Sequence, residues 1–145
     1  MRKLFTIFTL LLLTVGFAYG KKSVRVSYSN ELSAITLDWS DDTLRWSAHF
    51  GDKEIVAPSR LTMTTDRGVW GEGIKSACVK KFDCNTGNPF SWYSCAVVNF
   101  GDYSVELRAY MDGVAYRFIS NIEGDYLIID ELAEFSFDGE DNAWI

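Results

Sequence analysis

Hydrophobic and polar residues alternate most regularly between Ser104 and Phe118, and this pattern predicts two antiparallel strands around a tight turn. The apolar face of the first strand consists of Val105, Leu107 and Ala109. The return strand repeats the alternation with Val114, Tyr116 and Phe118. Between the strands, Asp112-Gly113 offers the two positions of positive φ that a two-residue hairpin loop requires.

Shorter alternating runs cover most of the chain after residue 22, and Gly, Asn and Asp turns separate them. These runs span residues 23–29, 35–39, 44–50, 53–56, 61–65, 96–100 and 126–129. Pro58 is expected to stop the fourth run or to place it at a sheet edge. No stretch longer than a turn shows helical spacing with caps. The pattern therefore predicts an all-β protein built as an antiparallel β-sandwich.

The first twenty residues have the features of a secretory signal peptide. Arg2 and Lys3 are basic, residues 4–17 form an apolar run, and Ala18-Tyr19-Gly20 offers small residues at a cleavage site. The run is short for a membrane span and does not recur, so we expect no membrane segment after cleavage. We expect an exported protein, periplasmic or secreted, with one domain over residues 21–145.

Composition narrows the class of protein. The chain is 48% hydrophobic, which indicates a packed domain. Its 145 residues are too few for an α/β barrel of about 250 residues. The net charge of −6 disfavours a nucleic-acid partner, because phosphate contacts need a basic patch. Aromatic residues make up 15%, and their alternation assigns most of them to strand packing.

Catalytic groups are scarce. The single histidine, His49, lies opposite the apolar face of its predicted strand, so we expect a solvated surface residue without a partner. Acidic residues are densest at Asp130-Glu131 and over residues 138–141, where predicted turns leave carboxylates solvated. The second group lacks the spacing of an EF-hand calcium loop. We predict no catalytic residue and no metal site in this chain.

The three cysteines leave two alternatives open. An exported protein meets an oxidising compartment, so a disulfide between Cys84 and Cys95 could close the loop between them. Alternatively, Cys78, Cys84 and Cys95 are all reduced and pack as small hydrophobic residues. With one histidine and no CxxC motif, the three cysteines make a poor zinc site.

Four segments resemble the N-terminal β-domain of glycoside hydrolase family 97. They are Ala57–Leu61 (APSRL), Val69–Glu72 (VWGE), Val105–Phe118 and Ile129–Ile145. Residues 83–93 depart from the family pattern. The resemblance implies a super-sandwich of β-strands in exported bacterial enzymes that cut α-linked sugars, in which this domain packs on a catalytic (β/α)8 barrel.

The resemblance also implies that the chemistry lies outside this chain. In the family, catalytic carboxylates lie on the barrel, and glutamates that we place beyond residue 145 hold a calcium ion. No catalytic or metal residue of the family maps onto a position here, so we expect the chain alone to be inactive. Whether the parent enzyme takes α-glucosides or α-galactosides, with inversion or retention, stays open.

The family's β-domain is longer than this chain, so we expect an incomplete sandwich, the first half of that domain. The hairpin residues expected to lose their cover are Val105, Leu107, Val114, Tyr116 and Phe118. An alternative is a free-standing carbohydrate-binding module without catalytic activity. Its stacking platform would consist of Phe90, Trp92 and Tyr93, which lie beside a predicted loop.

Overall fold

The computed structural model describes residues 22–40, 42–85, 87 and 92–137, and within these residues all regular structure is β-strand. No helix in this described part is long and apolar enough to cross a membrane. The predicted signal peptide, residues 1–20, and the acidic residues 138–141 lie outside it.

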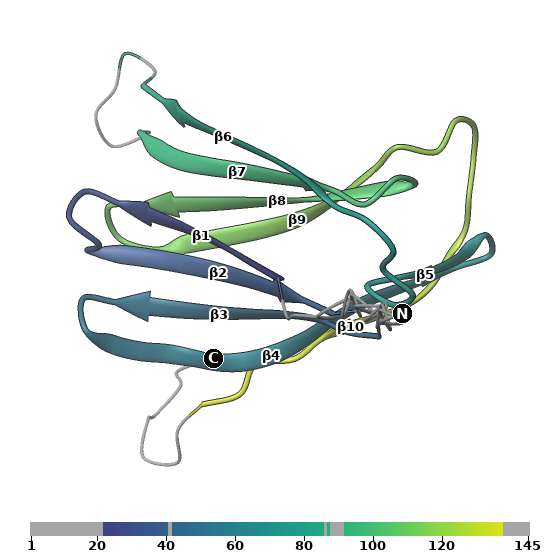
Figure 1. Ribbon diagram of the computed structural model, residues 1–145, viewed down its shortest axis with the longest axis horizontal. Coiled ribbons are helices and arrows are strands. Elements are labelled where there is room, and N and C mark those ends of the chain that lie inside the picture. The colour runs from purple at the N-terminus through teal and green to yellow at the C-terminus, as the bar shows by residue number, and fades with distance from the viewer. Residues whose placement is uncertain (1–21, 41, 86, 88–91, 138–145) are drawn as a thin grey trace, which may run out of the picture.

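The strands form two antiparallel sheets (Figure 1). The first sheet has the order β1-β2-β3-β4-β10, with β5 also paired to β4. Its strands are β1 (Lys22–Tyr28), β2 (Ser33–Trp39), β3 (Leu44–Phe50), β4 (Lys53–Thr65), β5 (Gly68–Trp70) and β10 (Ile128–Ala133). The second sheet has the order β6-β7-β8-β9. Its strands are β6 (Cys78–Cys84), β7 (Tyr93–Asn99), β8 (Tyr103–Tyr110) and β9 (Val114–Ser120).

The core lies between the two sheets and is built by the alternation seen in the sequence. Residues at every second position of β1 and β2 face residues at every second position of β7 and β8. The fully buried members include Ile35, Leu37, Leu44, Val98, Val105 and Leu107. The predicted antiparallel sandwich is therefore confirmed.

The two sheets are offset, so they cover one another unequally. β1 and β2 pack over β7, β8 and part of β9, whereas β3 and β4 extend past the end of the second sheet. Val105 and Leu107 are consequently 0% exposed, and the expectation that they lose their cover is wrong. Val114, Tyr116 and Phe118 on β9 are only half-buried, as expected. The boundary of the covered region runs between β8 and β9.

The central hairpin is confirmed, but its turn differs from the prediction. β8 and β9 pair from Tyr103↔Ser120 to Ala109↔Val114, and Tyr110 N donates to Gly113 O at 2.8 Å. Neither Asp112 nor Gly113 has a positive φ. The pairing places Gly113 last in the four-residue turn, where a turn with negative central φ angles favours glycine. The two central residues of the turn are therefore Met111 and Asp112, one residue earlier than predicted, and the predicted positive φ angles are wrong.

Pro58 neither ends a strand nor lies on an outer edge, in contrast to the prediction. β4 runs through it, between β3 on one side and the chain after β10 on the other. The register between β3 and β4 shifts between Trp46 and Ala48, so Pro58 lies in a bulge where no ladder hydrogen bond is needed. The last predicted run was also displaced, because β10 begins at Ile128 and continues to Ala133.

Candidate functional site: an open groove between the sheets

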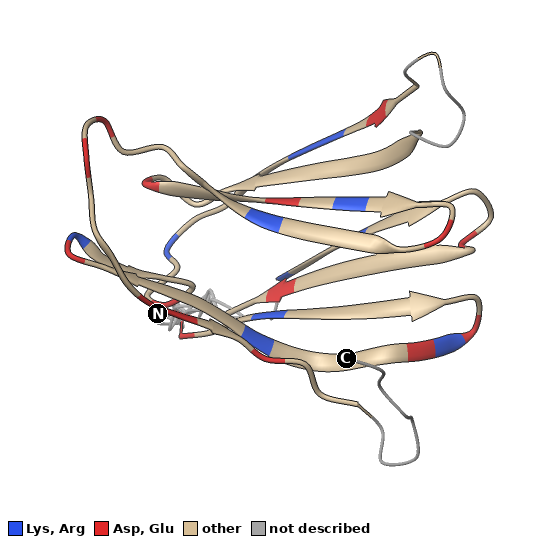
Figure 2. Ribbon diagram, turned by 180° about the vertical axis from the view of Figure 1, so that it is seen from behind, with Lys and Arg blue, Asp and Glu red and all other residues tan. Residues whose placement is uncertain are grey.

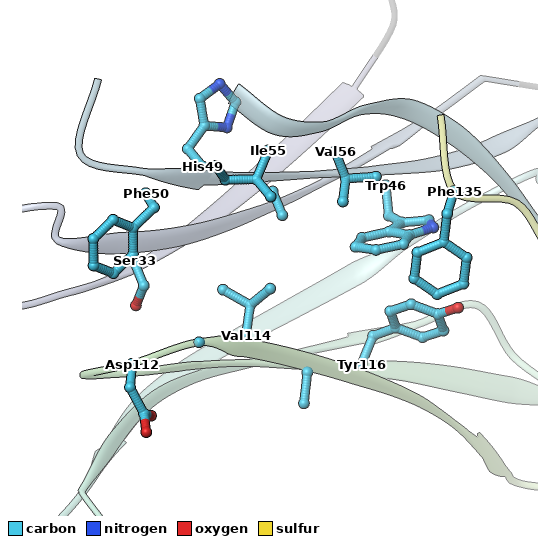
Figure 3. A pocket seen from close by; sticks show the side chains of 13 residues that line it. Ser33, Trp46, His49, Phe50, Ile55, Val56, Asp112, Val114, Tyr116 and Phe135 are labelled. Carbon is cyan, nitrogen blue, oxygen red and sulfur yellow. The ribbon is translucent and has the colours of Figure 1, made fainter. Parts of the chain in front are cut away.

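A groove of about 560 Å³ opens where β3 and β4 extend past β9 (Figure 3). One wall comes from β3 and β4, the other from the β8–β9 turn and β9, and Phe135 lies at one end. The larger apolar side chains that line it are Trp46, Phe50, Ile55, Val56, Val114 and Tyr116. The groove is thus an uncovered continuation of the core.

Three aromatic residues form the deep end of the groove. The ring centroid of Trp46 lies 4.9 Å from that of Tyr116 and 5.0 Å from that of Phe135. Trp46 Nε1 donates to the carbonyl oxygen of Glu134 at 3.1 Å, which satisfies the one polar atom of a buried indole. Phe135 remains 53% exposed. Trp46 thus joins the two other rings at this end of the groove, while Phe135 keeps much of its surface open.

The polar residues that line the groove include Ser33, His49 and Asp112. Ser33 is buried, and its hydroxyl donates to the carbonyl oxygen of Tyr110, which ties β2 to the end of β8. The imidazole Nε2 of His49 lies 3.6 Å from a carboxylate oxygen of Glu54. The expectation of a solvated His49 without a partner is therefore wrong, because the β3–β4 register places Glu54 directly opposite.

Of the candidate stacking residues that the structure describes, Trp92 and Tyr93 do not line this groove. Phe90 lies outside the described residues. Trp92 is 37% exposed just before β7. The ring of Tyr93 lies 5.2 Å from that of Tyr110, and the guanidinium of Arg108 lies 4.5 Å above it. Tyr93 is therefore occupied by neighbouring side chains on the outer face of the second sheet, at a distance from the groove wall on β9.

A buried ion cluster on that outer face was missed by sequence reasoning. Glu106 is 5% exposed, accepts from Arg108 Nη2 at 3.0 Å and binds Arg117 Nε across the β8–β9 ladder. Burial opposes ionisation of Glu106, but the hydrogen bonds from both arginines outweigh it, so its pKa lies below the usual value. The charged positions lie side by side on β8 and β9 (Figure 2). The available signal was that Glu106 and Arg108 alternate with the apolar residues Val105, Leu107 and Ala109 of the same strand.

The cysteines are free in the structure. Cys78 is exposed, Cys84 is half-buried and Cys95 is buried. Cys84 pairs with Tyr93 and Cys95 pairs with Phe82, so the two cysteines are diagonal rather than opposite across β6 and β7. Diagonal neighbours have Cα atoms roughly 7–8 Å apart, which is too far for a disulfide. Of the two alternatives, the structure supports three reduced thiols, but only Cys95 is buried as that alternative expected.

The described residues assemble no group of three or more His, Cys, Asp or Glu side chains that could hold a metal ion. Asp130 and Glu131 lie exposed on β10, and neither lines the groove. The implied calcium ion of the family therefore does not fit these residues.

Comparison with known proteins identifies the family. A family model described as the glycosyl-hydrolase 97 N-terminal domain matches residues 26–145. The chain belongs to this family. The match confirms the resemblance carried by the four sequence segments.

Relatives of the family-97 chain are much longer than the chain itself. This chain is 29% identical over 155 aligned residues to a retaining alpha-galactosidase from Bacteroides thetaiotaomicron. The alignment covers 99% of this chain and 23% of that protein. Among solved structures the chain is similar to a family-97 enzyme from Pseudoalteromonas sp. strain K8 in complex with acarbose, with a TM-score of 0.60 and 19% identity. A glutamate-to-glutamine form of a family-97 enzyme from that strain, in complex with panose, gives the same values.

Those structural matches cover 79% of this chain and 20% of each solved chain. At this identity they show the fold alone. The chain thus spans about a fifth to a quarter of its relatives and corresponds to their N-terminal β-sandwich.

Proposed function

We propose that this family-97 chain is the non-catalytic N-terminal part of an exported α-glycosidase, in which it supports a catalytic domain. The observation that carries the proposal is the family match over residues 26–145. The site geometry agrees with it, because the groove is apolar and presents no pair of carboxylates flanking a common space. Export rests on the signal-like pattern of residues 1–20.

The substrate class is an α-linked oligosaccharide bound by the parent enzyme. The relative from B. thetaiotaomicron is named a retaining alpha-galactosidase, and the two solved relatives carry acarbose and panose. Both α-galactosides and α-glucosides are therefore candidates. Any calcium ion would be held by a part of the parent enzyme outside the described residues, since these contain no suitable ligand cluster.

A chimera tests the proposal directly. The segment of the B. thetaiotaomicron enzyme that aligns with this chain is replaced by this chain, and hydrolysis of 4-nitrophenyl α-galactoside is followed. We expect the chimera to hydrolyse the substrate, whereas the same enzyme lacking the segment is insoluble or inactive. The 145-residue chain by itself should release no nitrophenol from either the α-galactoside or the α-glucoside, with or without calcium.

Two results would contradict the proposal. One is clear turnover by the purified 145-residue chain. The other is full activity of the enzyme from which the segment has simply been deleted, because a support that can be removed without effect is no support.

The alternative function, a free-standing carbohydrate-binding module, rests on the exposure of Trp92 just before β7. Titration of the chain with maltooligosaccharides and galactooligosaccharides, followed by tryptophan fluorescence, separates the two readings. Saturable quenching that is lost in Trp92→Ala and kept in Phe82→Ala, a second exposed aromatic substitution, would favour the module. The scaffold proposal expects no saturable change.

A further inference from the structure

We propose that the free edge of β9 receives a β-strand from another part of the family-length polypeptide, and that the side chains of this strand fill the groove. This proposal rests on the proposed function, because it assumes that the chain is one part of a longer enzyme. It specifies the sheet edge that is used, the residues of β9 that bond to the incoming strand, and the side-chain pattern that this strand must have.

The backbone of β9 can pair with a second strand on the side away from β8. Tyr110 and Gly113 form a hydrogen-bonded pair, and in an antiparallel ladder such pairs alternate with non-bonded ones. The bonded residues of β9 are therefore Ala115, Arg117 and Ile119, which face β8. The backbone N–H and C=O groups of Val114, Tyr116 and Phe118 point the other way. Among the described residues, no strand pairs with that edge.

The same three residues direct their side chains to the inner face of the sheet, where Val114 and Tyr116 line the groove and Phe118 packs against Trp70 and Tyr103. Val114 and Tyr116 lie across from Val56 and Trp46 (Figure 3). Residues directly opposite in an antiparallel pair share one face of the sheet. A strand bonded to Val114, Tyr116 and Phe118 would thus place every second side chain into the groove. Because the groove lining is apolar, those side chains must be apolar.

Charge defines the outer face of the incoming strand. Arg117 points to that face with a side chain that is 62% exposed, and it shares the single carboxylate of Glu106 with Arg108. Two guanidinium groups against one carboxylate leave a positive charge beside the edge. An acidic residue of the incoming strand opposite Arg117 would complement this charge. The expected strand therefore has apolar residues on its inner side and at least one acidic residue on its outer side.

A second copy of the chain is a poor occupant. β3 and β4 already extend past β9, so antiparallel pairing of β9 with its copy would bring both sets of β3 and β4 into one space. Parallel pairing about a two-fold axis would avoid this clash but would turn the copy's Arg117 into the apolar groove. By contrast, the relatives contain about four times more chain than the segment matched here, since it covers 23% and 20% of two of them.

The first test uses two fluorescein-labelled nine-residue peptides of equal composition. In one, valine and glutamate alternate; in the other, the valines and glutamates are separated into two blocks. We expect the alternating peptide to raise anisotropy saturably with the 145-residue chain and the block peptide to bind at least about tenfold more weakly. In residue-resolved hydrogen exchange, the alternating peptide should protect the amides of Val114, Tyr116 and Phe118.

Matched variants locate the binding site. Val114→Asp places a carboxylate in the groove, and Ala115→Asp places the same charge on the outer face of the adjacent position. We expect Val114→Asp to lower the affinity for the alternating peptide by at least about tenfold and Ala115→Asp to lower it by no more than about threefold. Only the first variant places an unpaired charge where the peptide would bury it. Equal effects, binding of both peptides alike, or protection elsewhere than at β9 would overturn the proposal. Self-association that protects the same amides would assign the edge to a second copy instead.

The chimera separates this inference from the proposed function. In an active chimera, the amides of Val114, Tyr116 and Phe118 should be protected without added peptide, and the alternating peptide should not bind. An active chimera with those amides unprotected would overturn the strand proposal and leave the function standing. An inactive chimera, together with specific peptide binding by the 145-residue chain, would overturn the proposed function and leave the strand proposal standing.

Discussion

The indole of Trp46 on β3 donates a hydrogen bond to the carbonyl oxygen of Glu134, 88 residues later in the chain. This bond holds the segment after β10 against the first sheet and brings Phe135 to the end of the groove. The backbone supports the same arrangement, because Glu134 N donates to Arg60 O at 3.1 Å and Arg60 N donates to Glu134 Oε2 at 2.7 Å. One side chain therefore connects the core, the groove and the last described segment.

Replacing Trp46 should separate its packing role from its hydrogen bond. Trp46→Phe keeps an aromatic ring and loses the donor, so we expect a loss of about 1–2 kcal/mol in the free energy of unfolding. Trp46→Ala also removes the ring from the core and should cost about 3–5 kcal/mol. Urea denaturation followed by circular dichroism measures both. Phe82→Leu, at an exposed position on the other sheet, is the control and should change stability by less than about 0.5 kcal/mol.

Local alternation predicted strands such as β1, β4 and β9 because one face of each is more buried than the other. The hairpin of β8 and β9 and the strands β1 to β3 were all located from this pattern. Features that depend on register between strands were not accessible. The pairing of His49 with Glu54 and the bulge at Pro58 are set by the shifted β3–β4 ladder, which the sequence of neither strand specifies.

The sequence predicted the groove only in part, as apolar side chains left uncovered along the central hairpin. Its true position depends on the offset between the sheets, a property of how two apolar faces meet. Val105 and Val114 carry the same side chain at equivalent places in the alternation, yet Val105 is fully buried and Val114 lines the groove. The ion cluster at Glu106 likewise required the β8–β9 register that brings Arg117 opposite.

Gly71 should be far less tolerant of substitution than its neighbour Gly73. A Cβ atom at Gly71 would lie 2.4 Å from the carbonyl oxygen of Leu61, and the residue has a φ of +96°. Gly73 has a φ of +61° and no atom within 4 Å of its would-be Cβ. Gly73→Ala should therefore cost only about 1–2 kcal/mol for the left-handed backbone. Gly71→Ala adds a backbone clash, so we expect an unfolding free energy lower by at least about 3 kcal/mol, or failure to fold.

The comparison of the two glycine variants by thermal denaturation contains its own control. Both changes add one methyl group at a position of positive φ in the same loop. Equal melting temperatures would show that the close approach of Leu61 to Gly71 does not constrain the protein.

Glu106 should give the chain a pH-dependent contribution to stability. Its folded pKa lies below the usual value, because two arginine hydrogen bonds outweigh the effect of burial. The folded state therefore binds fewer protons, and the contribution is present above the unfolded pKa of about 4.3 and disappears as pH falls through the lower folded pKa. Glu106→Gln should be less stable than the parent at pH 7, and the difference should shrink steadily below about pH 4.

Glu131→Gln is the matched control for this prediction, because Glu131 is exposed on β10. Urea denaturation of the three proteins between pH 7 and pH 3 measures the differences. If the gap between the parent chain and Glu106→Gln were constant over this range, the carboxylate would contribute through packing rather than through its charge.

The three thiols should differ in reactivity in the order set by their exposure and ionisation. Cys78 is exposed, whereas Cys95 is buried and its pKa is raised to about 11 by burial and by the adjacent carboxylate of Glu106. Because the thiolate is the reactive species, Cys78 should react first with an aromatic disulfide reagent at pH 8 and Cys95 last, by a margin of at least about a hundredfold. In urea all three should react at one rate, with three thiols counted per chain. Cys78→Ser should remove the fast phase alone; two missing thiols in the parent chain would instead reveal a disulfide and contradict the structure.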